Sequence, residues 1–427
     1  MPHAALPGFR DFYPEELAQR AYILGVWREV MRRYAFVEYD GPPLEPLDLY
    51  RQKSGDELVG QLYSFMDRGK REVALRPEMT PTFARMVAAR ANALRKPVRW
   101  FSIPQLFRNE RQQRGRLREH FQLNADLVGE SSETADAEVL AVALDVMRSL
   151  GLTYADVGAR VSDRRLLHVL LSHAGVSDDA MPGVYAVIDK RNREPADVAR
   201  EKLEGAVGSS DVADRVERVL GCRDVAGLIK RYSDVDGVAE HIDRMRKYLS
   251  HVAALGFGDW VRLDLSIVRG LAYYTGIVFE LFDTAVELRA ICGGGRYDTL
   301  LARLGGPDLP AVGFGMGDVV LGELLRSRNH VPSLVSRTDF WVASDDESLL
   351  EDIMIVASEL RRRNRSVEYA LRPQQLSRQL KAAASAGART VVILKRDRFA
   401  AREVTVKDLD SGSEISLPLE NFLSTLV

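Results

Sequence analysis

The chain has 427 residues, of which 46% are apolar and 28% are charged, and its formal net charge is −2. This length predicts about three domains, and the composition excludes a disordered, collagen-like or disulfide-scaffolded protein. Only two cysteines, Cys222 and Cys292, are present, which excludes a cysteine-rich zinc site and favours a reducing compartment. The N-terminus lacks an apolar signal core, and no stretch of about 18 apolar residues occurs, so a cytoplasmic protein is expected.

Helical spacing of apolar residues marks the first long element. Ile23, Trp27, Val30 and Tyr34 recur on one face, which predicts a helix over 13–34. The other elements expected in this part are helices over 81–94 and 132–150 and strands over 36–39, 73–75, 100–107 and 121–128.

The middle of the chain changes from helical to strand patterns. Residues 155–252 are mostly helical and highly charged, so we expect an inserted helical domain. Apolar and polar residues alternate over 260–268, which predicts a half-buried strand. Two further strands, 277–282 and 286–291, are close enough to form a hairpin. Hairpin strands are antiparallel, so a Rossmann-type parallel sheet is not expected in this half.

The pattern changes again near Arg337. Three strands alternate with two helices, which predicts an open α/β unit of roughly 90 residues. The strands are expected over 339–344, 367–370 and 390–394, the helices over 349–363 and 374–386, and a linker over 326–336.

This C-terminal unit carries a local excess of positive charge. Thirteen Lys and Arg side chains stand against three acids between Arg361 and Lys407. Such a stretch is either a solvated surface or the binding face for a polyanion.

A second basic segment, 108–118, holds five arginines and one acid between two predicted strands. Arginine forks onto phosphate oxygens, so this loop could project cations into a cleft. The alternative is a solvated hairpin tip. Gln122, Asn124 and Asp126 alternate on the following strand and therefore share one face. A polar face on a central strand favours a binding cleft over the solvated tip.

Three glycine-containing segments complete the candidate site: 268–276, 292–298 and 313–317. None has the lysine and spacing of a P-loop or the context of a dinucleotide-binding turn. We therefore interpret the glycines as admitting a close-packed backbone or a substrate. No histidine stands at metal-ligand spacing from another histidine or a cysteine, and no serine-hydrolase motif occurs.

Taken together, these segments resemble the histidyl-tRNA synthetases, a family of class II aminoacyl-tRNA synthetases. Residues 13–45 resemble the dimer-forming motif 1, and 107–122 are very similar to motif 2. Residues 269–276 and 293–298 resemble the two histidine-specific motifs. The basic α/β unit resembles the family's anticodon-binding domain. The resemblance therefore spans essentially the whole chain.

Two positions depart from the family pattern. Motif 3 usually ends Gly-x-Glu-Arg, with the arginine on ATP, but here Gly317 is followed by Asp318-Val319-Val320. Ala272 replaces the aspartate commonly found before the paired tyrosines. A runner-up is a non-synthetase paralogue that regulates ATP phosphoribosyltransferase in histidine biosynthesis. That paralogue typically lacks the C-terminal domain, whereas this chain has one.

The resemblance implies an α+β protein with an antiparallel class II sheet core flanked by helices, a helical insertion and a C-terminal α/β anticodon-binding domain. The expected division is catalytic core over 1–154 and 253–328, insertion over 155–252 and anticodon-binding domain over 336–427. It also implies a homodimer that ligates L-histidine to tRNA(His), using ATP and a histidyl-adenylate intermediate.

The same resemblance implies roles for individual residues. Arg108 and Arg269 would neutralise charge that grows on the α-phosphate. ATP would be placed by Arg108, Glu110 and Arg116, with Mg²⁺ on its β and γ phosphates. The expected histidine-binding set comprises Glu78, Met79, Thr80, Arg108, Gln122, Asp126, Arg269, Tyr273, Tyr274 and Tyr297.

Within that set, the substrate ammonium is expected on Glu78 and Thr80, with Gln122 assisting. The imidazole is expected on Asp126, Tyr274 and Tyr297. A carboxylate and hydroxyl groups can form hydrogen bonds with both ring nitrogens of histidine. An apolar competitor has no such nitrogens and could not form these hydrogen bonds.

Overall fold

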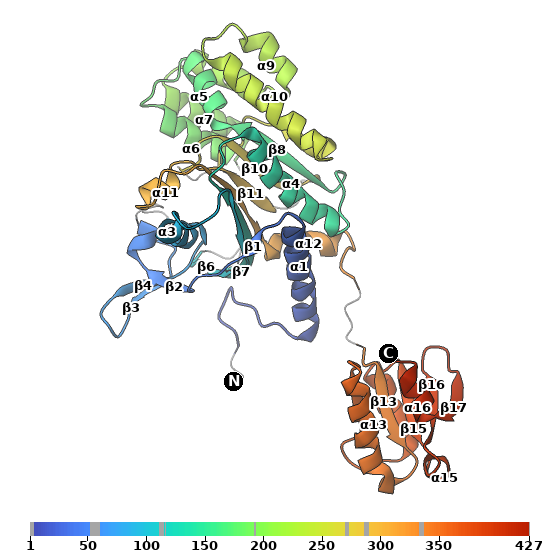
Figure 1. Ribbon diagram of the computed structural model, residues 1–427. Helices are drawn as coiled ribbons and strands as arrows, with labels where there is room; N and C mark the ends of the chain where they lie inside the picture. The colour runs from blue at the N-terminus through green and yellow to red at the C-terminus, as the bar shows by residue number, and fades with distance from the viewer. Residues whose placement is uncertain are drawn as a thin grey trace. The chain divides into compact units, whose positions relative to one another are not determined.

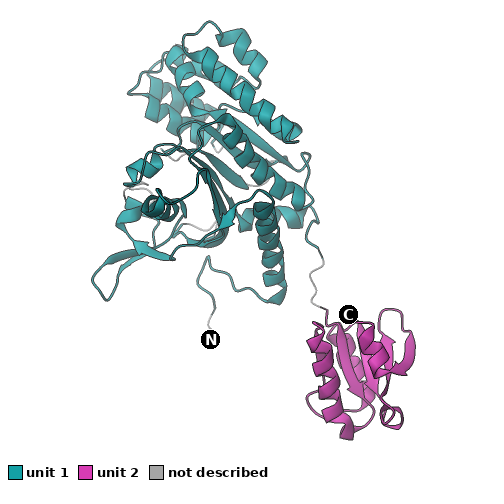
Figure 2. Ribbon diagram, in the orientation of Figure 1, with its two compact units in different colours: residues 1–332 teal, residues 333–427 magenta. Residues whose placement is uncertain are grey.

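The computed structural model describes residues 4–51, 60–110, 115, 117–191, 194–269, 273–285, 290–332 and 337–426. The chain folds into two compact units, Met1–Pro332 and Ser333–Val427 (Figure 2). Their boundary lies inside the linker predicted over 326–336. The further division of the first unit into a catalytic core and a helical insertion stays a prediction.

A nine-stranded sheet forms the centre of the first unit, in the order β1-β5-β7-β12-β11-β10-β8-β9, with β6 also paired to β7. Its strands are β1 (Val37–Glu38), β5 (Val98–Ser102), β6 (Gln105–Phe107), β7 (Glu119–Val128), β8 (Val157–Asp163), β9 (Val261–Leu263), β10 (Ile277–Asp283), β11 (Cys292–Arg296) and β12 (Ala311–Gly317). The pairs β1–β5 and β8–β9 are parallel, and the others are antiparallel. The predicted α+β class with a mainly antiparallel sheet is confirmed.

A small sheet and ten helices surround these strands in the described part of the first unit. The small sheet consists of β2 (Leu44–Pro46), β4 (Glu72–Leu75) and β3 (Ser64–Met66). The helices are α1 (Pro14–Arg33), α3 (Thr80–Arg90), α4 (Glu133–Ser149), α5 (Arg164–His173), α6 (Met181–Lys190), α7 (Ala196–Val207), α8 (Ser210–Leu220), α9 (Val225–Tyr232), α10 (Val238–Ala254) and α12 (Asp318–Ser327), with short turns α11 (Leu300–Arg303) and η2 (Gly258–Trp260).

Helix α4 covers the apolar face of the sheet. It packs against β7, β11 and β12 on one side and against α1 and α10 on the other (Figure 1). Leu140, Leu144 and Met147, predicted to share one face, are fully buried. Phe314 and Leu123 belong to the same core. Because apolar side chains occupy this face, the residues that alternate with them face the opposite side, where the candidate site lies.

Two predicted strands and one predicted helical region need correction. The strand expected over 260–268 ends at Leu263, where Asp264 accepts hydrogen bonds from the Ser266 backbone N–H and hydroxyl and closes a turn. The strand expected over 100–107 is two strands, β5 and β6, because Pro104 cannot donate a ladder hydrogen bond. The region expected to be helical over 155–252 also contributes β8 to the main sheet.

The antiparallel pairing expected after β10 is present, but most of the second strand expected over 286–291 lies outside the described residues, and Ala290 and Ile291 do not belong to a strand. The partner of β10 is β11, which contains the triple glycine. The apolar residues before Cys292 indicated a strand over 286–291. The strand that pairs with β10 begins at Cys292 and consists mainly of glycines.

The second unit has a five-stranded sheet in the order β14-β13-β15-β16-β17. The predicted strands β13 (Phe340–Ser344), β14 (Val367–Tyr369) and β15 (Thr390–Leu394) and helices α13 (Leu350–Arg362) and α14 (Leu376–Ser385) are confirmed. Not predicted were the strands β16 (Glu403–Asp408) and β17 (Glu414–Pro418) and the short helices η3 (Glu347–Leu349), α15 (Arg396–Phe399) and α16 (Leu419–Ser424). Among the described residues, no helix is both long and apolar enough to cross a membrane.

Candidate active site

Glycines form the centre of the open face of the main sheet. Gly313 of β12 lies opposite Asp126 of β7, and Gly315 lies opposite Gly293 of β11. Gly293 in turn lies opposite Glu280 of β10. Directly opposed residues point to the same face of a sheet. Gly293, Gly313 and Gly315 therefore form a floor without side chains, which lies between the polar face of β7 and the acidic side chain of Glu280.

Each of three floor glycines makes room for a side chain expected in the site. A Cβ atom on Gly313 would lie 2.1 Å from Oδ1 of Asp126, and one on Gly293 would lie 1.8 Å from Nη1 of Arg269. A Cβ atom on Gly315 would lie 3.0 Å from Cδ of Gln122. The interpretation that these glycines admit close approach is supported by these distances.

A cleft of about 690 Å³ opens over this floor. Four of the expected site residues line it, namely Arg108, Glu110, Gln122 and Arg269. Its other described side chains include His120, Arg160, Asp189, Phe282 and Glu280. The volume is in the usual range for a small-molecule or nucleotide site. Arg116 lies outside the described residues.

Arg269 is held in an unusual backbone conformation at the floor of the cleft. Its φ is +56°, in the left-handed region that costs a residue with a side chain of order 1–3 kcal/mol. Nη1 donates to Oε1 of Glu280 at 2.6 Å, and the guanidinium lies 5.8 Å from the ring centroid of Tyr274. Burial lowers its pKa, but Tyr274 and Glu280 outweigh this effect and raise the pKa, so the charge is secure.

Arg108 begins the arginine-rich loop, at the end of β6. Its Nε donates to the carbonyl of Pro77 at 2.9 Å, which fixes the start of the loop. Burial lowers the pKa of Arg108, Glu78 raises it and Arg269 lowers it, so these groups are within each other's electrostatic field. The β6–β7 hairpin that carries the loop is confirmed. Residues 111–114 lie outside the described residues.

A buried group of tyrosines and one acid adjoins the cleft. The hydroxyl of Tyr297 donates to Oδ1 of Asp126. The ring of Tyr273 lies 5.8 Å from that of Tyr297 and 4.7 Å from that of Tyr274. Burial and the Asp126 carboxylate raise the pKa of Tyr297, which keeps its proton on the hydroxyl. Through Tyr274 this group reaches Arg269, so it is continuous with the cleft.

The residues expected to hold the ammonium group stand at the start of α3. Glu78 is buried and close enough to Tyr273 to raise the pKa of its hydroxyl, after the larger effect of burial. Thr80 is the first residue of α3. Met79 precedes it and is buried, with its sulfur 3.9 Å from Nη1 of Arg76. Glu78 therefore lies beside the aromatic group, and Met79 contacts Arg76.

Sequence reasoning missed two residues of this site. Glu280 is the one charged residue between apolar neighbours in β10, and that break in the pattern was the available signal. Tyr39 has a buried hydroxyl whose pKa is raised by burial and then by Asp126. Nothing in its local sequence distinguishes it from a core tyrosine, because its nearness to Asp126 depends on tertiary packing.

The departure in motif 3 has a clear structural consequence. Oδ1 of Asp318 accepts the Phe121 backbone N–H at 2.9 Å, and Oδ2 pairs with Nη1 of Arg10 at 3.0 Å. Asp318 thus ties the segment before α1 to the sheet. Val319 and Val320 line the cleft, where the family pattern would place a glutamate and an arginine. The ATP contact of that arginine remains unassigned.

Comparison with known proteins agrees with this geometry. Residues 8–317 match the family model described as histidyl-tRNA synthetase, and residues 337–427 match the one described as anticodon binding domain. The chain is 43% identical over 420 residues to the histidine–tRNA ligase of Opitutus terrae, covering 97% of this chain and 96% of that protein.

Two solved structures share the fold. The histidyl-tRNA synthetase of Nostoc sp. PCC 7120 superimposes with a TM-score of 0.85 at 23% identity, covering 100% of this chain and 99% of that one. An ATP phosphoribosyltransferase regulatory subunit/histidyl-tRNA synthetase from Bacillus halodurans has a TM-score of 0.77 at 21% identity, covering 92% and 99%. The fold alone therefore does not separate the enzyme from the regulatory paralogue. The match over 8–317 and the identity to a ligase over nearly the full length show that the chain belongs to the histidyl-tRNA synthetase family.

Proposed function

We propose that this chain is a histidine–tRNA ligase that joins L-histidine to tRNA(His) at the expense of ATP. The observation that carries the proposal is the convergence of Arg108 and Arg269 on one cleft, next to the buried Asp126–Tyr297 pair. Two cations suit a polyphosphate, and a carboxylate with tyrosines suits an imidazole. Cytoplasmic location and the use of histidine, ATP and tRNA(His) follow from the same proposal.

The first step is attack of the histidine carboxylate on the α-phosphate, which gives histidyl-adenylate and pyrophosphate. The ribose at the end of the tRNA then attacks the adenylate. Neither step needs a nucleophile from the protein, so catalysis depends on orientation and charge neutralisation. Arg269 is suited to this role because Glu280 and the Gly293 floor already fix its guanidinium.

Recognition of histidine is assigned to the buried group. The Tyr297 hydroxyl donates to one oxygen of Asp126 and so orients the carboxylate, which then accepts the imidazole N–H. Glu78 and Thr80, with Gln122, hold the ammonium. Tyr273, Tyr274 and Met79 complete the pocket. Asp126 is buried, so a substrate that offers its carboxylate a donor is favoured over one that does not.

ATP is assigned to Arg108, Glu110 and Arg116. Mg²⁺ binds proteins through one or two carboxylates and the phosphates of the nucleotide. Glu110 lines the cleft and fits that role. Glu110 would hold the ion together with the phosphates of ATP. When bound, Mg²⁺ offsets charge on the β and γ phosphates.

The second unit is assigned to the anticodon arm, which its family match supports. Part of its positive charge is internally neutralised, because seven of the thirteen basic side chains pair with acids. Arg372, Arg378, Lys381 and Arg389 belong to the remainder. Phosphate contacts release counterions, so tRNA affinity is expected to fall steeply with salt.

The homodimer is assigned to the motif 1 segment. Along α1, Tyr22, Gly25, Val26 and Glu29 border a surface groove of about 590 Å³ beside Ser149. A largely apolar groove on an exposed helix suits a second copy of the chain.

Histidine-dependent exchange of labelled pyrophosphate into ATP tests the proposed function. The full chain is expected to exchange with histidine and not with other amino acids, because only histidine satisfies Asp126 and its tyrosines. Subsequent transfer of labelled histidine to tRNA(His) completes the test. Binding of histidine without any exchange would favour the regulatory paralogue.

Asp126→Asn isolates the imidazole contact. The variant keeps the shape of the side chain and an acceptor for Tyr297, but loses the charge. We expect the KM for histidine to rise about 10-fold to 10²-fold, as for a hydrogen bond to a charged group worth ~1.5–3 kcal/mol. The KM for ATP is expected to stay unchanged. Asp243→Asn, which removes an exposed carboxylate on α10, serves as the control. An unaltered histidine affinity in calorimetry would place the imidazole reader elsewhere.

A further inference from the structure

Two consecutive arginines open the helix that follows β8. Asp163 caps α5, because its side chain accepts the backbone N–H groups of Arg165 and Leu166. Arg164 and Arg165 therefore occupy the first turn of the helix. The backbone N–H of Arg164 donates to the carbonyl of Gly276 at 3.1 Å, so this turn is attached to the segment that carries the site tyrosines.

Arg164 binds the backbone on the N-terminal side of that segment. Its Nη1 donates to the carbonyls of Val268 at 3.0 Å and Arg269 at 3.4 Å. Its guanidinium lies 4.8 Å from the ring centroid of Tyr185 in α6. Burial lowers the pKa of Arg164, and nearby Tyr185 and Tyr274 oppose this effect. The charged donor is thus directed at two backbone carbonyls, one of them belonging to the strained Arg269.

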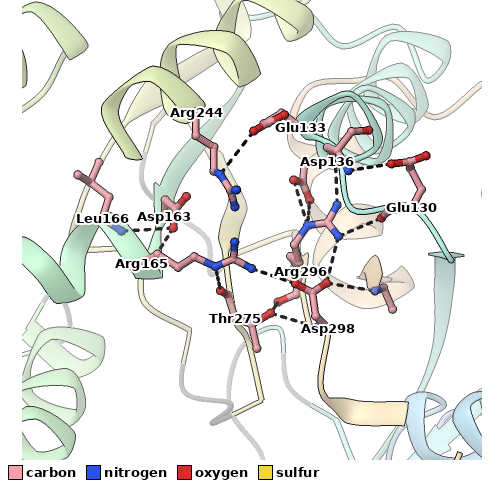
Figure 3. Close-up of polar contacts among 12 residues, drawn as sticks. Glu130, Glu133, Asp136, Asp163, Arg165, Leu166, Arg244, Thr275, Arg296 and Asp298 are labelled. Atoms are coloured by element: carbon pink, nitrogen blue, oxygen red, sulfur yellow. Dashed lines mark hydrogen bonds and ion pairs between the residues drawn. The ribbon is translucent and has the colours of Figure 1, made fainter. Parts of the chain in front are cut away.

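Arg165 binds the C-terminal side of the same segment. Its Nε donates to the carbonyl of Thr275 at 2.8 Å, and Nη2 pairs with Oδ2 of Asp298 at 3.0 Å (Figure 3). The backbone N–H of Thr275 donates to the Arg296 carbonyl at 2.8 Å. The Thr275 hydroxyl accepts the Asp298 N–H at 3.0 Å. Thr275 is therefore fixed between α5 and the end of β11.

We propose that Arg164 and Arg165 are positioning residues for histidine activation, because they hold both ends of the segment from Val268 to Thr275. This inference rests on the proposed role of Arg269. Arg269 reaches over Gly293 from a left-handed backbone, and such a conformation persists only where its surroundings enforce it. The two hydrogen bonds from Arg164 supply that constraint from outside the cleft.

The position of Arg164 separates it from the substrate contacts. Arg164 is not among the residues that line the cleft, whereas Arg269 is. Within the described residues, no ion pair joins Arg164 to a carboxylate, although Asp189, which lines the cleft, is near enough to oppose the effect of burial on the pKa of Arg164. A change at Arg164 is therefore expected to act on the orientation of Arg269 and not on ATP or histidine directly.

Arg164→Met tests the proposal in the full chain, because methionine keeps the stem beside Tyr185 and removes the donors. We expect kcat for pyrophosphate exchange to fall by about 10²-fold, as for a displaced catalytic group. The KM for ATP and the calorimetric affinity for histidine are expected to change less than about 3-fold, since Arg269 acts mainly in the transition state. Arg164→Lys, which retains one charged donor, is expected to recover about 10-fold of the loss.

Arg215→Met is the matched control. Arg215 also donates to a backbone carbonyl, that of Ala174, at 2.7 Å, but it lies on α8 away from the cleft. The kcat of Arg215→Met for pyrophosphate exchange is expected to match that of the unmodified chain. Should Arg164→Met fail to fold in circular dichroism, Arg164→Gln replaces it, with an expected loss of about 10-fold in kcat.

Combination with Arg269→Ala decides between positioning and an independent role. If Arg164 acts only through Arg269, the double variant has the same rate as Arg269→Ala alone. A multiplied loss in the double variant overturns the proposal, and so does a normal rate for Arg164→Met when Arg269→Ala is slow. A normal rate for Arg269→Ala itself overturns the proposed role of that arginine and the positioning role with it.

Discussion

Gly293→Ala is expected to slow adenylate formation by about 10²–10³-fold, as for the loss of a preorganised charge contact. The new Cβ would lie 1.8 Å from Nη1 and 2.4 Å from Cζ of Arg269. Both atoms belong to the far end of a flexible side chain, so the guanidinium moves and the strand stays. Arg269 then loses its place over the floor and its hydrogen bond to Glu280. Single-turnover formation of adenylate measures the effect.

Gly205→Ala provides the control for this variant. Gly205 lies on α7, where a Cβ would meet no atom within 4 Å. Alanine there is expected to leave the rate unchanged and to stabilise the chain by about 0.5–1 kcal/mol, the usual helical difference from glycine. A normal single-turnover rate for Gly293→Ala, with Arg269→Ala slow, would mean that the position of the guanidinium seen here is not the catalytic one.

Arg296→Met is expected to destabilise the first unit by about 3–5 kcal/mol, as for the loss of one partner from a buried ion pair. Arg296 is only 1% exposed, and its Nε donates to both oxygens of Asp136 at 2.9 and 3.1 Å. Its Nη1 donates to the carbonyl of Glu130 at 3.0 Å and to Oδ1 of Asp298 at 3.1 Å. The variant leaves Asp136 buried without its cation. Urea unfolding measures the loss.

The dependence on pH identifies the cause of that loss. Burial raises the pKa of Asp136 to about 7, and Arg296 acts in the opposite direction. The folded-state pKa of Asp136 already lies above its unfolded value, and without Arg296 it rises further, so the loss of stability as pH rises from about 4 becomes larger. The deficit of Arg296→Met should therefore be smaller at pH 5 than at pH 8. Adding Asp136→Leu should recover most of it, whereas an equal deficit at both pH values would mean that lost packing dominates.

Arg28→Met is the control for this pair. Arg28 forms an exposed ion pair with Glu38 at 3.0 Å. Exposed pairs contribute about 0–1 kcal/mol, so its loss should be small at both pH values.

Features set by neighbouring residues could be predicted from the sequence. Helical spacing located α1 and α4, and the alternation of Gln122, Asn124 and Asp126 located a polar face of β7, from which Gln122 lines the cleft. The end of β9 could not be found in this way, because apolar alternation continues through Leu265 although Asp264 closes a turn. The alternation of apolar and polar residues indicates which side chains are buried. It does not distinguish a strand from a turn, because a turn can bury apolar residues as well.

Contacts between distant segments were beyond the sequence pattern. The ion pair of Arg269 with Glu280 and the hydrogen bonds of Arg164 depend on how β8, β10 and β11 align. That alignment follows from long-range packing, which the residues around each position do not encode. Motif resemblance supplied the expected site residues, and their spatial arrangement had to come from the fold.

The pairing of β7 with β12 has a consequence for synthesis of the chain. β7 ends at Val128 and β12 begins at Ala311, so about 180 residues of the chain separate these neighbouring strands. At the usual 5–20 residues per second, roughly 10–40 s pass before β12 leaves the ribosome. During that interval β7 has an open edge, and open edges pair with other chains. Until the second half of the sheet arrives, the backbone groups along this edge of β7 are therefore expected to be open to pairing with other chains.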